Sequence, residues 1–226
     1  KRKKLLIFLT KLLKMNKKKL SIGTAQFLEG YGIGKNKKLN KKKINEIFNL
    51  CENYGINNLD TAVVYGPAEK ILGKFNLKTW NVTSKVNKVP LGVDVEKFIK
   101  TQVEISLKNL NIDYLDVLLL HYPMQLNTSV GDKSYNILNK LIEECKILSF
   151  GYSVYSPEEF LKIHKLFKSQ VCQIPFNIFD QRILNNDFQE LIIKDKITLQ
   201  IRSVFLQGLL LLKKNELNNY FNSWYE

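Results

Sequence analysis

The hydrophobic positions of the chain alternate between short continuous apolar runs and longer segments with helical spacing. Runs of four to eight residues bounded by turn residues are typical of strands in a parallel sheet. Seven such runs are present, at 20–24, 57–60, 81–85, 114–121, 147–154, 171–176 and 198–205. The run at 114–121 is nearly continuous, as expected of a strand covered on both faces. The alternation predicts repeated βα units in the α/β class.

Four segments between these strands place apolar residues on one face of a helix. They are 40–54, which Gly55 would terminate, 93–110, a segment that Pro157 opens after Ser156, and 187–194. His164, on the helix opened by Pro157, is expected to be exposed. No domain-sized linker or low-complexity tract interrupts the pattern, so residues 20–226 are predicted to form one domain.

The formal charge of +14 raises the question of nucleic-acid binding, but the charge is concentrated at one end. Residues 1–43 hold 15 of the 35 basic residues and only one acid, Glu29, which leaves 20 bases and 20 acids from Ile44 onward. Phosphate binding requires basic residues clustered on the folded surface. The composition therefore argues against a nucleic-acid partner.

The first 19 residues are interpreted as a basic extension outside the fold. The opening KRKKLLIFLTKLLK superficially resembles a signal peptide, but its apolar run is short, two lysines interrupt it and no small-residue cleavage site follows. It is also far shorter than a membrane span, which needs about 20 apolar residues. Because Met15 closely precedes the first strand, residues 1–14 are interpreted as translated upstream sequence. We expect a cytoplasmic protein without a membrane partner.

The three cysteines are Cys51, Cys145 and Cys172. They are odd in number and widely spaced, and they form no C-x-x-C pair. This pattern favours reduced thiols and predicts neither a disulfide framework nor a metal site.

Four ionisable side chains stand at or just after predicted strand ends. Asp60 ends the second strand, Tyr65 follows it by five residues, Lys85 ends the third, and His121 ends the fourth. Any one of them alone would more often be a helix cap, a surface group or a core residue. Because active sites of (β/α)8 barrels lie at the carboxyl ends of the strands, the four together indicate a catalytic centre.

The segments that carry these residues resemble the aldo-keto reductase family. The pattern D-T-A-x-x-Y-G-x-x-E is present from Asp60 to Glu69, followed by T-S-K ending at Lys85 and L-L-H-x-P around His121. The resemblance extends over about residues 20–212. It implies an incomplete (β/α)8 TIM barrel of aldo-keto reductase type, with seven strands present and the eighth strand and C-terminal segment missing.

The same resemblance implies the chemistry. Tyr65 would be the general acid that protonates a carbonyl oxygen as hydride arrives from NADPH, with NADH also possible. A neighbouring ammonium at Lys85 would favour the phenolate and so ease proton transfer. Asp60 would hold that ammonium, and His121 would orient the carbonyl. The forms GYSVYSPEEF and RSVFLQGLL suggest a bacterial branch with sugar-derived carbonyl substrates.

Cofactor contacts follow the family pattern only in part. The predicted binding residues are Thr24, Ser153, Gln173, Arg202, Ser203 and Gln207, with Asn177 as a less certain neighbour. Val154 stands where the family has an asparagine that holds the carboxamide. Arg202 stands where a tyrosine stacks on the nicotinamide, and a guanidinium plane can also stack or bind phosphate. The loop GYGIGK lacks the residues of a phosphate-binding Walker motif.

Three alternatives remain open beside the reductase. The chain could be an inactive truncated fragment, a non-catalytic barrel serving as a regulatory subunit, or a lyase that forms a Schiff base through Lys85. In the resembled family the segment after the eighth strand binds the 2′-phosphate of NADPH. We therefore expect weak cofactor binding by these 226 residues. The sequence does not determine the oligomeric state.

Overall fold

The computed structural model describes residues 19–27, 39–217 and 220–221, so residues 1–18 of the predicted N-terminal extension and the GYGIGK loop lie outside the described part. The described residues form one sheet of seven parallel strands in sequential order. The strands are β1 (Ser21–Gly23), β2 (Asn58–Asp60), β3 (Asn81–Val86), β4 (Leu115–Leu120), β5 (Ile147–Ser153), β6 (Val171–Pro175) and β7 (Thr198–Arg202). All seven predicted strands are confirmed.

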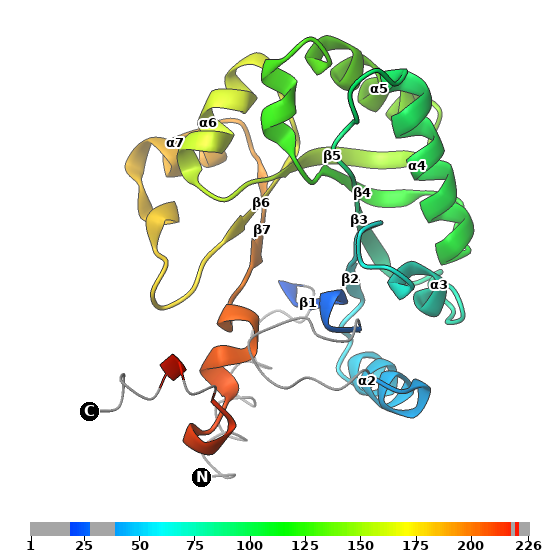
Figure 1. The fold of residues 1–226 in the computed structure, drawn as a ribbon, viewed down its shortest axis with the longest axis vertical. Helices are drawn as coiled ribbons and strands as arrows, with labels where there is room; N and C mark the ends of the chain where they lie inside the picture. The colour runs from blue at the N-terminus through cyan, green and yellow to red at the C-terminus, as the bar shows by residue number, and fades with distance from the viewer. Residues whose placement is uncertain (1–18, 28–38, 218–219, 222–226) are drawn as a thin grey trace.

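The strands follow an arc, and the helices lie on its outer side (Figure 1). The helices are α2 (Lys41–Asn53), α3 (Ala68–Leu72), α4 (Val95–Leu110), α5 (Gly131–Glu143), α6 (Pro157–Leu166) and α7 (Asn186–Lys194). This arrangement is an incomplete (β/α)8 barrel, as predicted. The helices α3 and α5 were not predicted, because α3 has only five residues and α5 begins without a side-chain cap.

Polar side chains fix where three of the predicted helices begin. The side chains of Asn40, Asp94 and Ser156 accept hydrogen bonds from backbone N–H groups three residues ahead, at 2.9, 2.7 and 3.4 Å respectively. Each bond satisfies one donor that the first helical turn leaves free. At the other end of α2, Gly55 takes the left-handed conformation expected after a helix, with φ of 65°.

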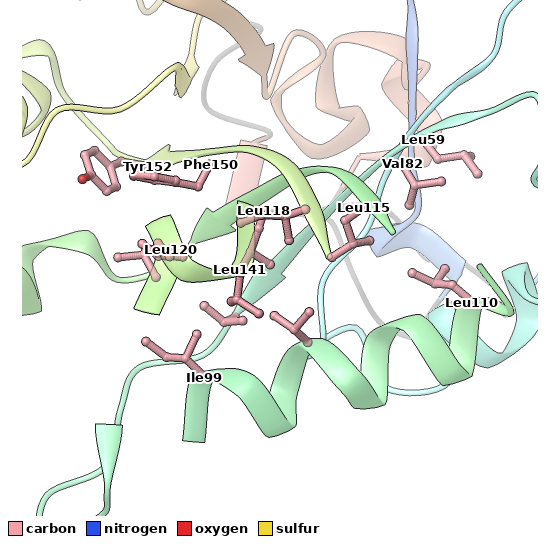
Figure 2. Close-up of a cluster of buried hydrophobic side chains, with 14 of the residues drawn as sticks. Leu59, Val82, Ile99, Leu110, Leu115, Leu118, Leu120, Leu141, Phe150 and Tyr152 are labelled. Carbon is pink, nitrogen blue, oxygen red and sulfur yellow. The ribbon is translucent and has the colours of Figure 1, made fainter. Parts of the chain in front are cut away.

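The main core lies between the sheet and its covering helices. Figure 2 shows Ile99 of α4 and Leu141 of α5 directed toward Leu118 of β4 and Phe150 of β5, and all four side chains are at most 1% exposed. Burying one such side chain contributes about 1.5–3 kcal/mol. This packing holds α4 and α5 against the sheet.

A cluster of three aromatic side chains packs beside the start of β3. Phe48 of α2 stacks on Phe75 with ring centroids 4.1 Å apart, and its centroid lies 5.0 Å from that of Trp80. Trp80 is 6% exposed and directly precedes β3. The cluster therefore lies at the amino end of that strand.

One strand pair requires a residue without a side chain. Gly151 of β5 pairs with Val171 of β6, and a Cβ atom at Gly151 would lie 1.9 Å from the Val171 carbonyl oxygen. No side chain fits at that distance, so glycine is required here by close backbone approach.

Two predictions about the outer part of the fold were wrong. His164 is buried, not exposed: its Nε2 lies 2.9 Å from Asp195 Oδ2, and its Nδ1 accepts a hydrogen bond from the Ser169 backbone N–H at 3.2 Å. The ring faces α7 because α6 and α7 pack together. The last strand ends at Arg202, short of residue 205, because Ser203 has a positive φ of 59° that interrupts extended backbone.

Within the described ranges, no helix is long and apolar enough to cross a membrane.

Candidate active site

The predicted site residues gather where the parallel strands end. Asp60 is the last residue of β2, Lys85 the penultimate residue of β3, and His121 directly follows β4. Ser153 and Arg202 are the last residues of β5 and β7. Because neighbouring strands run in the same direction, these positions meet at the carboxyl edge of the sheet.

A buried ion pair forms the centre of this edge. Lys85 Nζ lies 2.7 Å from Asp60 Oδ1 and donates a second hydrogen bond to the Thr61 carbonyl oxygen at 2.9 Å. The Lys85 side chain is 1% exposed and that of Asp60 is 20% exposed. Burial lowers the pKa of Lys85, and the charge of Asp60 opposes that shift. The predicted contact between the two residues is therefore present.

Tyr65 stands in the turn between β2 and α3, beside this pair. Gly66 follows it with φ of 52°, a left-handed conformation that glycine adopts without strain. The Lys85 ammonium lies 5.3 Å from the centroid of the Tyr65 ring, and the ring meets His121 edge to face with centroids 6.3 Å apart. The structure thus brings together the phenol, ammonium, carboxylate and imidazole that the sequence predicted.

A buried carboxylate anchors the Tyr65 turn to β3. Glu69 of α3 is 2% exposed, accepts a hydrogen bond from the Ser84 hydroxyl at 2.7 Å and lies 3.5 Å from the side-chain nitrogen of Asn109. Ser84 directly precedes Lys85. Glu69 therefore links the element that follows Tyr65 to the strand that carries Lys85, a positional role that the motif alone did not reveal.

The imidazole of His121 is neutral at pH 7. Burial is the main cause that lowers its pKa to about 4, and the charges of Lys85 and Arg202 add to the effect while Asp60 opposes it. Its Nδ1 is buried without a hydrogen-bond partner among the described residues. A neutral ring keeps one N–H donor and one acceptor, so it can orient a polar group without adding charge.

A chain of amide and hydroxyl groups extends from the ion pair into the barrel. Gln173 of β6 donates from Nε2 to Asp60 Oδ1 at 2.8 Å and to Gln200 Oε1 at 3.1 Å, and its Oε1 accepts from the Ser153 hydroxyl at 3.3 Å. Gln200 Nε2 donates to the Thr83 hydroxyl at 3.1 Å. Sequence reasoning missed Gln200 and Thr83, although the two-residue period of a strand places Gln200 on the same face as Arg202.

Arg202 is held firmly at the end of β7. Its guanidinium lies 4.4 Å from the centroid of the Tyr155 ring and donates to the Val154 carbonyl oxygen at 3.0 Å and to the Ser203 hydroxyl at 3.4 Å. None of the described carboxylates lies within ion-pair distance of it. The backbone carbonyl of Val154 thus binds the arginine. The apolar side chain of Val154 cannot make the hydrogen bond to a carboxamide that the asparagine of the family makes.

The other predicted cofactor residues are placed less directly. Thr24 is fully buried, and its hydroxyl donates to the Asp60 carbonyl oxygen at 3.1 Å. Gln207 is exposed in the turn after β7, where its φ is 56°. The side chain of Asn177 donates to the Ser203 carbonyl oxygen at 3.3 Å, so it shapes the loops after β6 and β7. Binding roles for these residues stay predictions.

A pocket of about 480 Å³ lies beside these loops. Its walls are mostly apolar and include Phe176, Val204, Phe205 and Leu210. Within the part of the chain that the structure describes, no group of three His, Cys, Asp or Glu side chains could hold a metal ion.

Comparison with known proteins gives one consistent family. The model of the aldo/keto reductase family matches residues 19–224. Glyoxal reductase of Bacillus subtilis is 28% identical over 191 residues, 80% of this chain and 65% of that protein. A probable voltage-gated potassium channel subunit beta of Arabidopsis thaliana is 26% identical over 220 residues, 89% of this chain and 66% of that protein.

Solved structures show the same fold. An aldo-keto reductase from Klebsiella pneumoniae in complex with NADPH superimposes with a TM-score of 0.66 at 21% identity, covering 84% of this chain and 65% of that one. The chain spans about one third to two thirds of the length of the curated relatives that it matches.

Proposed function

The chain belongs to the aldo/keto reductase family, and from this premise we propose that it is an oxidoreductase that reduces an aldehyde or ketone to an alcohol with hydride from NADPH, or from NADH. The observation that carries the proposal is the position of the Tyr65 ring, 5.3 Å from the Lys85 ammonium and edge to face with His121.

Tyr65 is the proton donor in this proposal. An alkoxide that forms as hydride reaches a carbonyl carbon needs a proton, and the phenol of Tyr65, whose ring lies beside both Lys85 and His121, can donate one. A nearby ammonium stabilises the phenolate that remains after transfer. In the oxidative direction the same phenolate accepts the proton.

Lys85 and Asp60 tune this donor. The ammonium is 1% exposed, so its charge acts on Tyr65 with little screening by water. Asp60 holds the ammonium at 2.7 Å and offsets the cost of burying it. His121, neutral at pH 7, orients the substrate oxygen by a hydrogen bond.

The donor and acceptor set fits the carboxamide of a nicotinamide cofactor, whose reduced ring would supply the hydride when the cofactor is bound. Ser153 and Gln173 are both 3% exposed, and the Gln173 Oε1 has a lone pair beyond the one used by the Ser153 hydroxyl. Arg202 lies at the neighbouring strand end, with a planar group that can stack. Thr24, Ser203 and Gln207 complete the proposed cofactor contacts.

The substrate proposed is a small, sugar-derived aldehyde or ketone. Glyoxal reductase among the relatives acts, by its name, on a small dicarbonyl, which supports a small carbonyl substrate. The apolar pocket at the loops after β6 and β7, which Phe205 lines three residues after Arg202, offers space for a less polar part of the molecule.

The test is reduction of glyoxal and D-glyceraldehyde, followed as NADPH absorbance at 340 nm. General acid catalysis contributes about 10² to 10⁴ in rate, so Tyr65→Phe is expected to lower kcat by that range and to leave KM within a few fold. Tyr114→Phe, at a tyrosine 45% exposed, is the matched control and is expected to behave like the parent.

A second candidate function is a non-catalytic subunit, which the similarity to a probable channel subunit favours. No reduction by a parent that binds NADPH would replace the reductase proposal with this one. Equal, measurable rates for Tyr65→Phe and the parent would instead reject Tyr65 as the proton donor.

A further inference from the structure

Gln200 sits at the centre of β7 and connects that strand to the far side of the barrel. Its Oε1 accepts from Gln173 Nε2 at 3.1 Å, and its Nε2 donates to the hydroxyl of Thr83 on β3 at 3.1 Å. Strand β7 pairs directly only with β6 among the described residues. The side chain of Gln200 thus bridges two strands that share no backbone hydrogen bonds.

Three of the four N–H hydrogens on the two side-chain amides have an identified acceptor. The Gln173 side-chain nitrogen carries two hydrogens, and one is directed to Asp60 Oδ1 at 2.8 Å and the other to Gln200 Oε1. If the Gln173 amide were flipped, its oxygen would face the Asp60 carboxylate, and two acceptors would oppose each other. Gln200 presents its oxygen because the second Gln173 hydrogen needs an acceptor, and its nitrogen then donates to the Thr83 hydroxyl, which holds the side chain in place.

The register of the sheet sets this geometry. Gln173 and Gln200 are directly paired across β6 and β7, and Asp60 and Thr83 are directly paired across β2 and β3. The backbone therefore fixes all four positions. The side-chain bonds then decide only which end of each amide faces its neighbour.

We propose that Gln200, anchored by Thr83, is a positioning residue: it fixes the amide of Gln173 and, through that amide, holds the Asp60 carboxylate on Lys85. The inference rests on the proposed function, since it assigns Gln200 to the support of the same centre. Asp60 Oδ1 receives two donors, Lys85 Nζ at 2.7 Å and Gln173 Nε2 at 2.8 Å. Loss of the second donor frees the carboxylate to rotate away from the ammonium.

The experiment titrates Lys85 by NMR in the full chain, with lysine labelled at Cε. The variants are Gln200→Met and Thr83→Val, which remove the bonds with little change of volume, and Thr83→Ser, which keeps the hydroxyl. Gln189→Leu on the exposed face of α7 is the control. A purely structural role of Gln200 would alter unfolding but not the titration of Lys85.

Burial lowers the pKa of Lys85, and the nearby charge of Asp60 raises it. If the carboxylate moves away, the pKa of Lys85 therefore falls further. Gln200→Met and Thr83→Val are expected to lower the pKa of Lys85 by about 1 unit, the effect of weakening one close charge contact. Thr83→Ser and Gln189→Leu are expected to leave it unchanged. In a Gln173→Met background, Gln200→Met is expected to have no further effect.

The proposal is overturned if Gln200→Met leaves the Lys85 titration unchanged, or if the shift persists undiminished in the Gln173→Met background. The titration needs no turnover, so it is independent of the Tyr65→Phe assay. If Gln200→Met shifts the pKa of Lys85 but the parent shows no reductase activity, the positioning role is retained and the proposed function is rejected. If the parent is an active reductase but Gln200→Met leaves the pKa of Lys85 unchanged, the proposed function is retained and the positioning role is rejected.

Discussion

Replacing Asp60 by asparagine removes one partner of the buried ion pair and leaves the other charged. Breaking a buried pair in this way costs about 3–5 kcal/mol. The Lys85 side chain is 1% exposed but that of Asp60 is 20% exposed, so water reaches one end of the contact. We therefore expect a loss near the lower limit, about 3 kcal/mol of unfolding free energy at pH 7.

The pH dependence of this loss has a definite sign. Burial lowers the pKa of Lys85 in the folded protein from its usual 10.5, and Asp60→Asn removes the charge that opposes the shift. Between the folded pKa and 10.5, the unfolded chain binds more protons than the native one, so stability rises with pH. The slope reaches at most about 1.4 kcal/mol per pH unit for one group. The deficit of the variant should therefore shrink as the pH rises from the lowered pKa of Lys85 toward 10.5.

Urea unfolding followed by circular dichroism measures both effects. Lys85→Met in the Asp60→Asn background removes the stranded charge and should recover most of the loss. Glu46→Gln, in the exposed pair with Lys43, is the control and should cost no more than about 1 kcal/mol. The reasoning fails if Asp60→Asn costs no more than Glu46→Gln, or if the double variant is no more stable than Asp60→Asn alone.

Two further predictions concern other residues of the strands and the site. Gly151→Ala should cost about 3 kcal/mol or more, because the added Cβ meets the Val171 carbonyl at 1.9 Å. Gly23→Ala, where the added Cβ has no neighbour within 4 Å among the described residues, should cost less than about 1 kcal/mol in the same urea experiment. His121 should titrate near pH 4 when its ring is followed by NMR. Between pH 6.5 and pH 4 the unfolded chain binds a proton that the native ring does not, so the unfolding free energy should fall as the pH is lowered through this range. A ring pKa above 6 would contradict the buried, positively surrounded position.

The strands could be predicted because parallel strands are buried on both faces and so appear as short apolar runs. The meeting of Asp60, Lys85 and His121 followed from that topology, since strand ends converge whatever the loops do. The end of β7 could not be predicted, because nothing in the letters RSVF shows that Ser203 adopts a positive φ.

Side-chain partners were harder to predict than strand positions. His164 looks like a polar residue on an amphipathic helix, and only the packing of α6 against α7 brings Asp195 to its ring. Gln200 and Thr83 are 117 residues apart in sequence, and their contact depends on the curvature of the whole sheet. Local pattern carries no information about such pairs.

The aromatic cluster around Trp80 gives the protein an internal optical reporter. Its indole is 6% exposed and packs on Phe48, so its emission should shift to longer wavelength when α2 separates from β3. Because Trp80 precedes β3 and Lys85 lies near the other end of that strand, the signal follows packing at the amino end of the barrel and not events at the candidate site. The second tryptophan, Trp224, lies outside the described residues, and a Trp224→Phe variant would leave Trp80 as the single emitter.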